Sequence, residues 1–137
     1  MATIHAGGCA CGKVRYETSG DPVDVHICHC KKCQLRTGSA FGTSVYFPKE
    51  RVKFLSGSLR KVRRSSDSGR WLESEFCENC GTTVTWTLEL AEALRGIAGG
   101  TYDDAGWLKP NVHIWTESAT GWVDYPKDAQ LHARQHI

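Results

Sequence analysis

Seven cysteines are the residues of this sequence most capable of chemistry. They fall in three groups within the 137 residues: Cys9-Ala-Cys11, Cys28-His-Cys30-Lys-Lys-Cys33 and Cys77-Glu-Asn-Cys80. Buried structural thiols would be scattered singly, and a disulfide framework fits an odd number of cysteines poorly. Spacings of the C-x-C and C-x-x-C kind are typical of metal ligands, so the sequence favours metal binding.

The first and third groups together predict a closed structural zinc site. In C-x-x-C-G the chain turns tightly, so the sulfurs of Cys77 and Cys80 converge, and Gly81 supplies an unusual backbone angle. Glycines around Cys9 and Cys11 let the backbone bend and bring that pair together as well. Tetrahedral zinc needs sulfurs roughly 3.8 Å apart, given a Zn–S bond of about 2.3 Å. Four thiolates would tie the start of the chain to its middle.

The second group predicts a different zinc site. Cys28, Cys30 and Cys33 combine both spacings, and three protein ligands with an exchangeable fourth position are the pattern of catalytic zinc. An ion with three thiolate ligands is a weak Lewis acid toward water but holds a soft thiol as thiolate. A thiol or a thiol adduct is therefore the expected substrate.

A closed site completed by a histidine is the open alternative for the second group. The candidates are His26, His29 and His113. His29 is the poorest of them, because it lies between two ligands and would point to the opposite side of an extended segment. His113 is also a candidate for an acid/base group.

The elements that must position these groups are mostly β-strands. Short runs rich in Val, Thr, Tyr, Phe and Trp recur between Gly, Ser, Asp and Pro. They predict strands at Lys13–Thr18, Phe41–Phe47, Val52–Leu55, Lys61–Arg64, Trp71–Phe76, Thr82–Thr87, Gly96–Tyr102 and Val112–Trp115. Short helices are expected at Cys30–Thr37, ended by Gly38, and at Leu88–Arg95. Without a linker or repeat, residues 1–137 are predicted to form a single, mainly β, mostly antiparallel domain.

Composition narrows the partners and the compartment. A net charge of +2, with basic residues that are not interleaved with aromatics, argues against nucleic-acid binding. No apolar leader or run of about 18 apolar residues is seen, so we expect a cytoplasmic protein without membrane contact. The basic run Arg60–Arg64 is expected to be a solvated hairpin face, with capture of an anionic thiol as the alternative. Three tryptophans are expected in the core: Trp86, Trp115 and Trp122.

Six motifs occur in a characteristic order along the chain. They are Gly7-Gly-Cys-Ala-Cys-Gly-Lys-Val-Arg-Tyr16, Cys28-His-Cys-x-x-Cys33, Gly38-Ser-Ala-Phe41, Phe76-Cys-x-x-Cys-Gly-Thr82, Gly100-Thr-Tyr-Asp103 and Pro110-Asn-Val-His-Ile-Trp115. In this order they resemble the glutathione-dependent formaldehyde-activating enzyme family, which shares its domain with centromere protein V. Family members often carry an arginine directly after the last cysteine of the second motif. Here that position is Gln34, and Arg36 follows two residues later.

The resemblance implies an antiparallel β-tent of the Mss4-like fold with two zinc ions. The structural zinc would be held by Cys9, Cys11, Cys77 and Cys80. The catalytic zinc would be held by Cys28, Cys30 and Cys33, and would be lost more easily because it has one ligand fewer. The implied reaction is that of a carbon–sulfur lyase acting on glutathione and formaldehyde, with S-hydroxymethylglutathione as the adduct. Two alternatives remain open: a non-catalytic Mss4-like zinc module that binds a protein partner, and a thiol or redox sensor.

Overall fold

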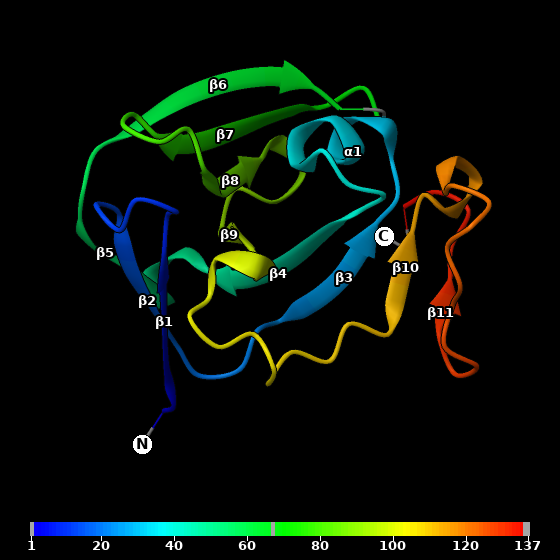
Figure 1. Ribbon diagram of the computed structural model, residues 1–137, viewed down its shortest axis with the longest axis horizontal. Helices are drawn as coiled ribbons and strands as arrows, with labels where there is room; N and C mark the ends of the chain where they lie inside the picture. Colours follow the sequence, from blue (N-terminus) through cyan, green and yellow to red (C-terminus); the bar gives the residue numbers. More distant parts are fainter. Residues whose placement is uncertain (1, 67, 136–137) are drawn as a thin grey trace.

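The computed structural model describes residues 2–66 and 68–135, and strands account for most of the regular structure in this part of the chain (Figure 1). The strands are β1 (Ile4–Gly8), β2 (Arg15–Ser19), β3 (Asp24–Cys28), β4 (Gly42–Pro48), β5 (Val52–Ser56), β6 (Leu59–Ser65), β7 (Trp71–Cys77), β8 (Thr83–Leu88), β9 (Leu94–Ala98), β10 (Val112–Ile114) and β11 (Gln130–Leu131). The helical elements of the same residues are α1 (Lys31–Thr37) and the 3₁₀ segments η1 (Lys49–Arg51), η2 (Glu89–Ala91), η3 (Gly99–Thr101) and η4 (Thr116–Ser118). The predicted mainly β class is confirmed.

The described strands form two sheets. The smaller has the order β1-β2-β5, and the larger has the order β11-β10-β3-β4-β9-β8-β7-β6. In Figure 1 the smaller sheet lies at one side of the molecule, and β10 and β11 lie at the other. Strand pairs within these sheets are antiparallel, except that β10 runs parallel to β3 and to β11. The predicted pairing is mostly antiparallel, and the observed pairing is antiparallel apart from the two pairs made by β10. This arrangement is consistent with a β-tent of the Mss4-like fold.

The core lies between the two sheets and is filled by alternate residues of their strands. Successive side chains of a strand point to opposite faces. On β4 and β9, Val45, Phe47 and Ile97 point to the core and are fully buried. Tyr16 of β2 packs against them from the smaller sheet. Burial of a side chain such as Phe47 contributes roughly 1.5–3 kcal/mol. The residues between these core positions point to the other face of the larger sheet, where the candidate site lies.

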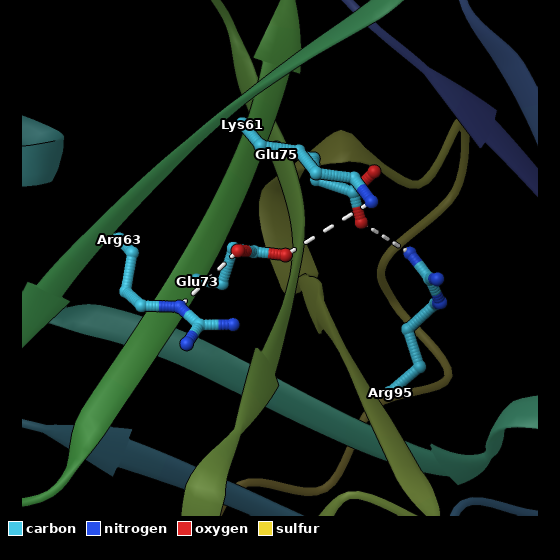
Figure 2. Close-up of polar contacts among 5 residues, drawn as sticks. All are labelled: Lys61, Arg63, Glu73, Glu75 and Arg95. Carbon is cyan, nitrogen blue, oxygen red and sulfur yellow. Dashed lines mark hydrogen bonds and ion pairs between the residues drawn. The ribbon is translucent and has the colours of Figure 1, made fainter.

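An ion-pair network marks the core-side face of β7. Figure 2 shows Glu73 and Glu75 pointing to the same side of this strand, as residues two apart must. Arg95 of β9 donates to the largely buried Glu75 carboxylate at 2.7 Å. Glu73 is shared between Lys61 and Arg63 at 4.0 and 3.3 Å, in a more exposed position. Within this network of described residues, the Glu75–Arg95 pair is the one shielded enough to contribute to stability.

The helix predicted at Leu88–Arg95 is wrong. Leu88 is the last residue of β8 and pairs with Leu72, and Leu94 already pairs with Pro48 in β9. Strand pairing on both sides of this segment leaves only a few residues for the connection, which form the 3₁₀ turn η2. A longer helix has no room there, and a helix of so few residues is unstable alone. The strand predicted at Gly96–Tyr102 begins earlier and ends at Ala98, where η3 takes over.

Two further expectations need correction or completion. Trp122 is not a core residue: its exposed fraction is 75%. Strands β1, β3 and β11 were not predicted. Strands β1 and β11 carry few β-branched or aromatic residues, whereas in β3 the alternation of Val25 and Ile27 with polar residues is a strand signal that was missed. The helix predicted at Cys30–Thr37 is confirmed as α1, with Gly38 in the left-handed conformation at its end. Within the described residues, helices are all too short or too polar to cross a membrane.

Candidate metal centre

The first cysteine cluster lies where the two sheets meet. Cys9 and Cys11 follow β1 of the smaller sheet, and Cys77 and Cys80 flank the turn after β7 of the larger sheet. Their four sulfurs all lie within 4.8 Å of one another, with Cys9–Cys11 at 3.5 Å and Cys11–Cys77 at 3.8 Å. Tetrahedral zinc with thiolate ligands requires separations of about 3.8 Å. This donor set therefore fits a four-coordinate metal ion.

Backbone and hydroxyl groups around this cluster favour thiolates over thiols. The N–H groups of Val14 and Asn79 donate to the sulfurs of Cys9 and Cys77 at 3.3 and 3.4 Å. Hydrogen bonds from the hydroxyl and the backbone N–H of Thr82 lower the pKa of the Cys80 thiol to about 5. Thiolate is the form that binds a metal, so these hydrogen bonds prepare the cluster for a cation.

The second cluster is built where β3 ends and α1 begins. Cys28 is the last residue of β3, Cys30 is the N-cap of α1, and Cys33 lies in its first turn. This change from strand to helix brings the three sulfurs within 4.8 Å of one another. The Cys33 N–H donates to the Cys30 sulfur at 3.4 Å. Cys28 and Cys30 are buried, and Cys33 is half-buried.

The three thiols of the second cluster share negative charge. Hydrogen bonds from Cys28 and Cys33 hold the pKa of the Cys30 thiol far below its usual value. The pKa of Cys28 lies far above its usual value, mainly because of its hydrogen bonds with Cys30 and Cys33. Three sulfurs this close cannot all become thiolates without a cation between them. The donor set fits a metal ion bound through three sulfurs.

The three predicted histidine candidates lie outside the group of three sulfurs and are hydrogen-bonded to other side chains. His29 is fully buried, and its Nε2 shares a hydrogen bond of 2.9 Å with Nδ1 of His113. Among the described residues, the other ring nitrogen of each has no hydrogen-bond partner. His26 pairs through Nδ1 with the Asp24 carboxylate at 3.0 Å. Among the described residues, the side chains close enough to hold a metal ion at this place are the three cysteines, and no histidine belongs to the group.

A cavity of about 370 Å³ opens directly onto Cys28 and Cys30. It lies on the face of the larger sheet opposite the core, because its lining comes from alternate residues of successive strands. The strand residues that line it include Asp24, His26 and Cys28 of β3, Ser44 and Tyr46 of β4, Trp86 and Leu88 of β8, and Leu72 and Ser74 of β7. The cavity therefore joins the second cluster to the middle of the sheet.

Two arginines border the cavity near the cysteines. Arg36 of α1 lies with its guanidinium carbon 4.7 Å from the centre of the Trp86 ring. The positive charge of Arg64 helps to lower the pKa of Cys30, which places this side chain on the same side of the cavity. Within residues 2–66 and 68–135, no carboxylate forms an ion pair with Arg36 or Arg64. The two guanidinium groups are thus available to an anion.

Tyr46 was missed by the sequence analysis as a site residue. The indole N–H of Trp86 donates to the Tyr46 hydroxyl at 2.9 Å, so the hydroxyl hydrogen is directed elsewhere. Burial raises the pKa of Tyr46, and the nearby sulfurs of Cys33 and Cys28 add to the effect. The spacing Asp24-x-His26-x-Cys28 was a usable signal for the face of β3 that lines the cavity, since it places three polar side chains on one face of a strand. Nothing local in the sequence links Tyr46 to the cysteines.

Comparisons with known proteins find a related sequence and a related fold. A Penicillium rubens protein named "Putative glutathione-dependent formaldehyde-activating enzyme" is 24% identical over 138 aligned positions, which cover 92% of this chain and 71% of the relative. The crystal structure of a Rhodobacter sphaeroides protein is similar with a TM-score of 0.58 and 16% identity, covering 77% of this chain and 91% of that one. At this identity the structural likeness concerns the fold alone.

The family comparison covers most of the chain. Residues 4–118, which include all seven cysteines and both clusters, match the family described as "Glutathione-dependent formaldehyde-activating enzyme". The same description was reached from the order of the cysteine motifs. The chain belongs to the glutathione-dependent formaldehyde-activating enzyme family.

Proposed function

We propose that this protein is a zinc-dependent enzyme of the carbon–sulfur lyase type, acting on a thiol such as glutathione and an aldehyde. The observation that supports this most is the position of the second cluster: three converging sulfurs, two of which line a cavity. The same cavity carries the guanidinium groups of Arg36 and Arg64, which have no carboxylate partner among the described residues. The first cluster has four sulfurs and does not line this cavity. We assign it a structural zinc and the second cluster the catalytic one.

The cysteines would act by holding a metal ion that keeps a thiol ready to react. A zinc ion bound by Cys28, Cys30 and Cys33 would supply a position at which the substrate sulfur is held as a thiolate, its nucleophilic form. In the direction of adduct formation, this sulfur attacks the aldehyde carbon and the carbonyl oxygen gains negative charge. In the reverse direction the carbon–sulfur bond breaks and the thiolate departs.

Arg36 and Arg64 would bind the carboxylates of the thiol. Both guanidinium groups face the cavity beside the cysteines, and a guanidinium binds a carboxylate through two parallel hydrogen bonds. The Trp86 ring under Arg36 restricts where its guanidinium can lie, so less conformational freedom is lost when the carboxylate binds. Arg36 would thus replace the arginine that related sequences carry at the position of Gln34. The Gln34 amide is occupied otherwise, since it donates to the carbonyls of His29 and Ser118.

Tyr46 would donate a hydrogen bond to the aldehyde oxygen. Its oxygen already accepts from the Trp86 indole, so its own hydrogen is left for a second partner in the cavity. Its raised pKa keeps the phenol protonated at neutral pH. A fixed donor of this kind stabilises the charge that develops on oxygen while the carbon–sulfur bond forms.

Replacement of zinc by cobalt provides the test, because cobalt–thiolate absorption reports on the ligands. We expect glutathione to change the absorption of the cobalt-loaded protein, and Cys30→Ser to abolish that change. Cys11→Ser is the matched control, since it alters the second cysteine of the other C-x-C pair and should leave the glutathione response in place. A spectrum that does not respond to glutathione would contradict the proposal and favour a non-catalytic zinc module.

A further inference from the structure

The end of the cavity remote from the cysteines is lined by leucines. Four of them, Leu72, Leu88, Leu90 and Leu94, form what we call the leucine wall. Leu72 and Leu88 are cross-strand partners in β7 and β8. With Leu94 they pack against the buried pair Tyr46 and Trp86, so the wall is continuous with the proposed donor.

The leucine wall is not buried within the protein. Leu72, Leu88 and Leu94 are only partly buried, and the exposed fraction of Leu90 is 37%. Apolar surface left in contact with water is unfavourable, and covering it with an apolar group is favourable by about 25 cal/mol per Å². Formaldehyde has a single carbon and could not cover four leucines. Glutathione is polar along its length and would gain little by lying there.

Another part of the cavity lining is polar. Arg64, Ser66, Ser68 and Arg70, from the end of β6 and the turn that follows, line it together with Arg36 of α1. These side chains suit the carboxylates and amides of a peptide thiol. Arg64 is the cross-strand partner of Leu72, so these polar residues adjoin the leucine wall. A ligand with its sulfur at Cys28 and Cys30 therefore meets a polar and an apolar surface in the same cavity.

We propose that the preferred substrate is an adduct of a glutathione-like thiol with a large apolar aldehyde, whose carbon chain or ring lies on the leucine wall. This inference rests on the proposed function and names its substrate class. The peptide part would extend toward the arginines, and the aldehyde-derived arm would extend past Tyr46 to Leu88.

The reaction is the same addition for any such aldehyde, and it balances without an oxidant or a reductant. The thiol loses its proton, the sulfur forms a bond to the carbonyl carbon, and the π electrons of the C=O bond move to the oxygen. That oxygen takes up a proton and becomes a hydroxyl group. In reverse, the hydroxyl loses its proton, the carbon–sulfur bond breaks, and the aldehyde and the thiol are released.

Stable thioethers allow the apolar arm to be tested without turnover. S-methylglutathione and S-hexylglutathione carry the same peptide and differ only in the length of the arm on sulfur. We expect isothermal titration calorimetry on the zinc-loaded protein to show binding of the hexyl compound at least about tenfold more tightly, because its methylenes are removed from water on the leucine wall. In Leu88→Asn this preference should fall below about threefold.

Two further variants make the result specific. Leu55→Asn changes a more exposed leucine on β5, outside the cavity, and should keep the full preference for the hexyl compound. Leu88→Trp fills the space instead of changing its polarity, so it should weaken the hexyl compound while leaving the methyl compound unaffected. It also serves if Leu88→Asn does not fold.

The possible outcomes separate this inference from the proposed function. Equal affinity for the two thioethers in the unchanged protein overturns the inference, and so does a preference that survives both Leu88 variants. If that happens while the cobalt-loaded protein still responds to glutathione, the proposed function stands and only the apolar arm is wrong. If the cobalt spectrum does not respond to glutathione, both proposals fail.

Discussion

The hydroxyl of Tyr46 owes its direction to a single neighbour, the indole of Trp86. Because the indole can only donate, it fixes which side of the phenol oxygen is occupied. The position of the Trp86 ring in turn depends on Gly96, where any Cβ atom would collide with the indole. Because it has no side chain, Gly96 leaves room for the Trp86 ring and so contributes to the geometry of the candidate site.

Tyr46→Phe should lower kcat for adduct formation by about 10–100-fold, since loss of one preorganised donor to a developing oxyanion typically costs this much or more. The response of the cobalt-loaded variant to glutathione should be unchanged, because the thiol does not use this hydroxyl. The matched control is Tyr16→Phe in the core, whose hydroxyl contacts Thr101. Full kcat in Tyr46→Phe would exclude the proposed role.

Gly42→Ala should raise the KM for glutathione about tenfold with little change in kcat. An added Cβ would lie 2.6 Å from a guanidinium nitrogen of Arg36, so the arginine must move from its place over Trp86. Gly100→Ala is the control, since no heavy atom lies within 4 Å of its added Cβ. Steady-state kinetics with varied glutathione measure the effect, and an unchanged KM would mean that Arg36 does not bind the thiol.

Single residues were predictable from the sequence only where the signal is local. The cysteine groups were readable because their spacing is short, and the structure brings each predicted set together. Tyr46 was not readable as a site residue, because the register of separate strands carries it to the cysteines. Arg64 was named only within the basic run Arg60–Arg64, for which capture of an anionic thiol was the alternative role. Trp86 was expected in the core; it is buried, yet it also lines the cavity.

At the scale of elements, the Glu75–Arg95 pair couples β7 to β9. Arg95→Ala would leave the Glu75 carboxylate largely buried and without its partner. We expect a loss of about 2 kcal/mol in the free energy of unfolding. This is less than for a fully buried pair, because Arg95 is partly exposed. Arg60→Ala, which removes an exposed pair with Glu78, should cost less than about 1 kcal/mol. Urea unfolding of the zinc-loaded proteins measures both, and equal losses would show that burial does not distinguish the pairs.

The His29–His113 contact joins β10 to the residue that follows β3. Burial lowers the pKa of both imidazoles, and for His29 the charge of His113 contributes as well. The unfolded chain, with a histidine pKa of about 6.5, then binds protons more readily than the folded one. The stabilisation is complete above that pH and is lost as the pH falls below it.

His113→Gln should therefore show a smaller decline of Tm than the unchanged protein when the pH is lowered from about 6.5 to 5. Protonation of the cysteine sulfurs occurs in both proteins, so it cancels in the difference between the two profiles. Thermal unfolding followed by circular dichroism at several pH values measures this difference. Parallel profiles would show that His113 does not titrate on unfolding.

Strand propensity predicted most elements but could not predict their partners. The runs at Phe41–Phe47, Trp71–Phe76 and Thr82–Thr87 correspond to β4, β7 and β8. Leu88–Arg95 has good helix formers, yet the pairing of both flanking strands overrides their preference. Strand β1, with the sequence Ile-His-Ala-Gly-Gly, is stabilised by its pairing with β2 and carries little propensity of its own.

At the scale of the whole molecule, the four-cysteine cluster connects the two sheets. Cys9 and Cys11 follow β1 of the smaller sheet. Cys77 and Cys80 lie at the end of β7 of the larger sheet, more than sixty residues further along the chain. Cys28, Cys30 and Cys33 lie within one short segment and close no long loop. A bond that closes a long loop removes more entropy from the unfolded chain.

Cys77→Ser should therefore lower Tm more than Cys30→Ser does, by at least about 10 °C, since a structural metal contributes several kcal/mol to folding. Zinc content measured on both variants is the control: each should retain the ion of the untouched cluster. Removal of all metal by a chelator should lower Tm by as much as Cys77→Ser or more. A larger loss from Cys30→Ser would reverse the assignment of the two clusters.

The cavity is a property of the whole molecule and was not predictable from local sequence. Its lining includes residues of β3, β4, β6, β7, β8, β9 and β10 and of helix α1, and it exists only once the larger sheet has assembled. The single-domain prediction over residues 1–137 stays a prediction. Two cysteine sites of different kinds, by contrast, followed from spacing alone, because four sulfurs and three sulfurs can close different coordination shells.

The central claim is tested most directly by diffraction from zinc-loaded crystals soaked with glutathione, with anomalous data collected at the zinc absorption edge. The account predicts two zinc peaks, one within bonding distance of the sulfurs of Cys9, Cys11, Cys77 and Cys80, and one bonded to Cys28, Cys30, Cys33 and the glutathione sulfur. A protein atom in that fourth position, retained in the presence of glutathione, would contradict it.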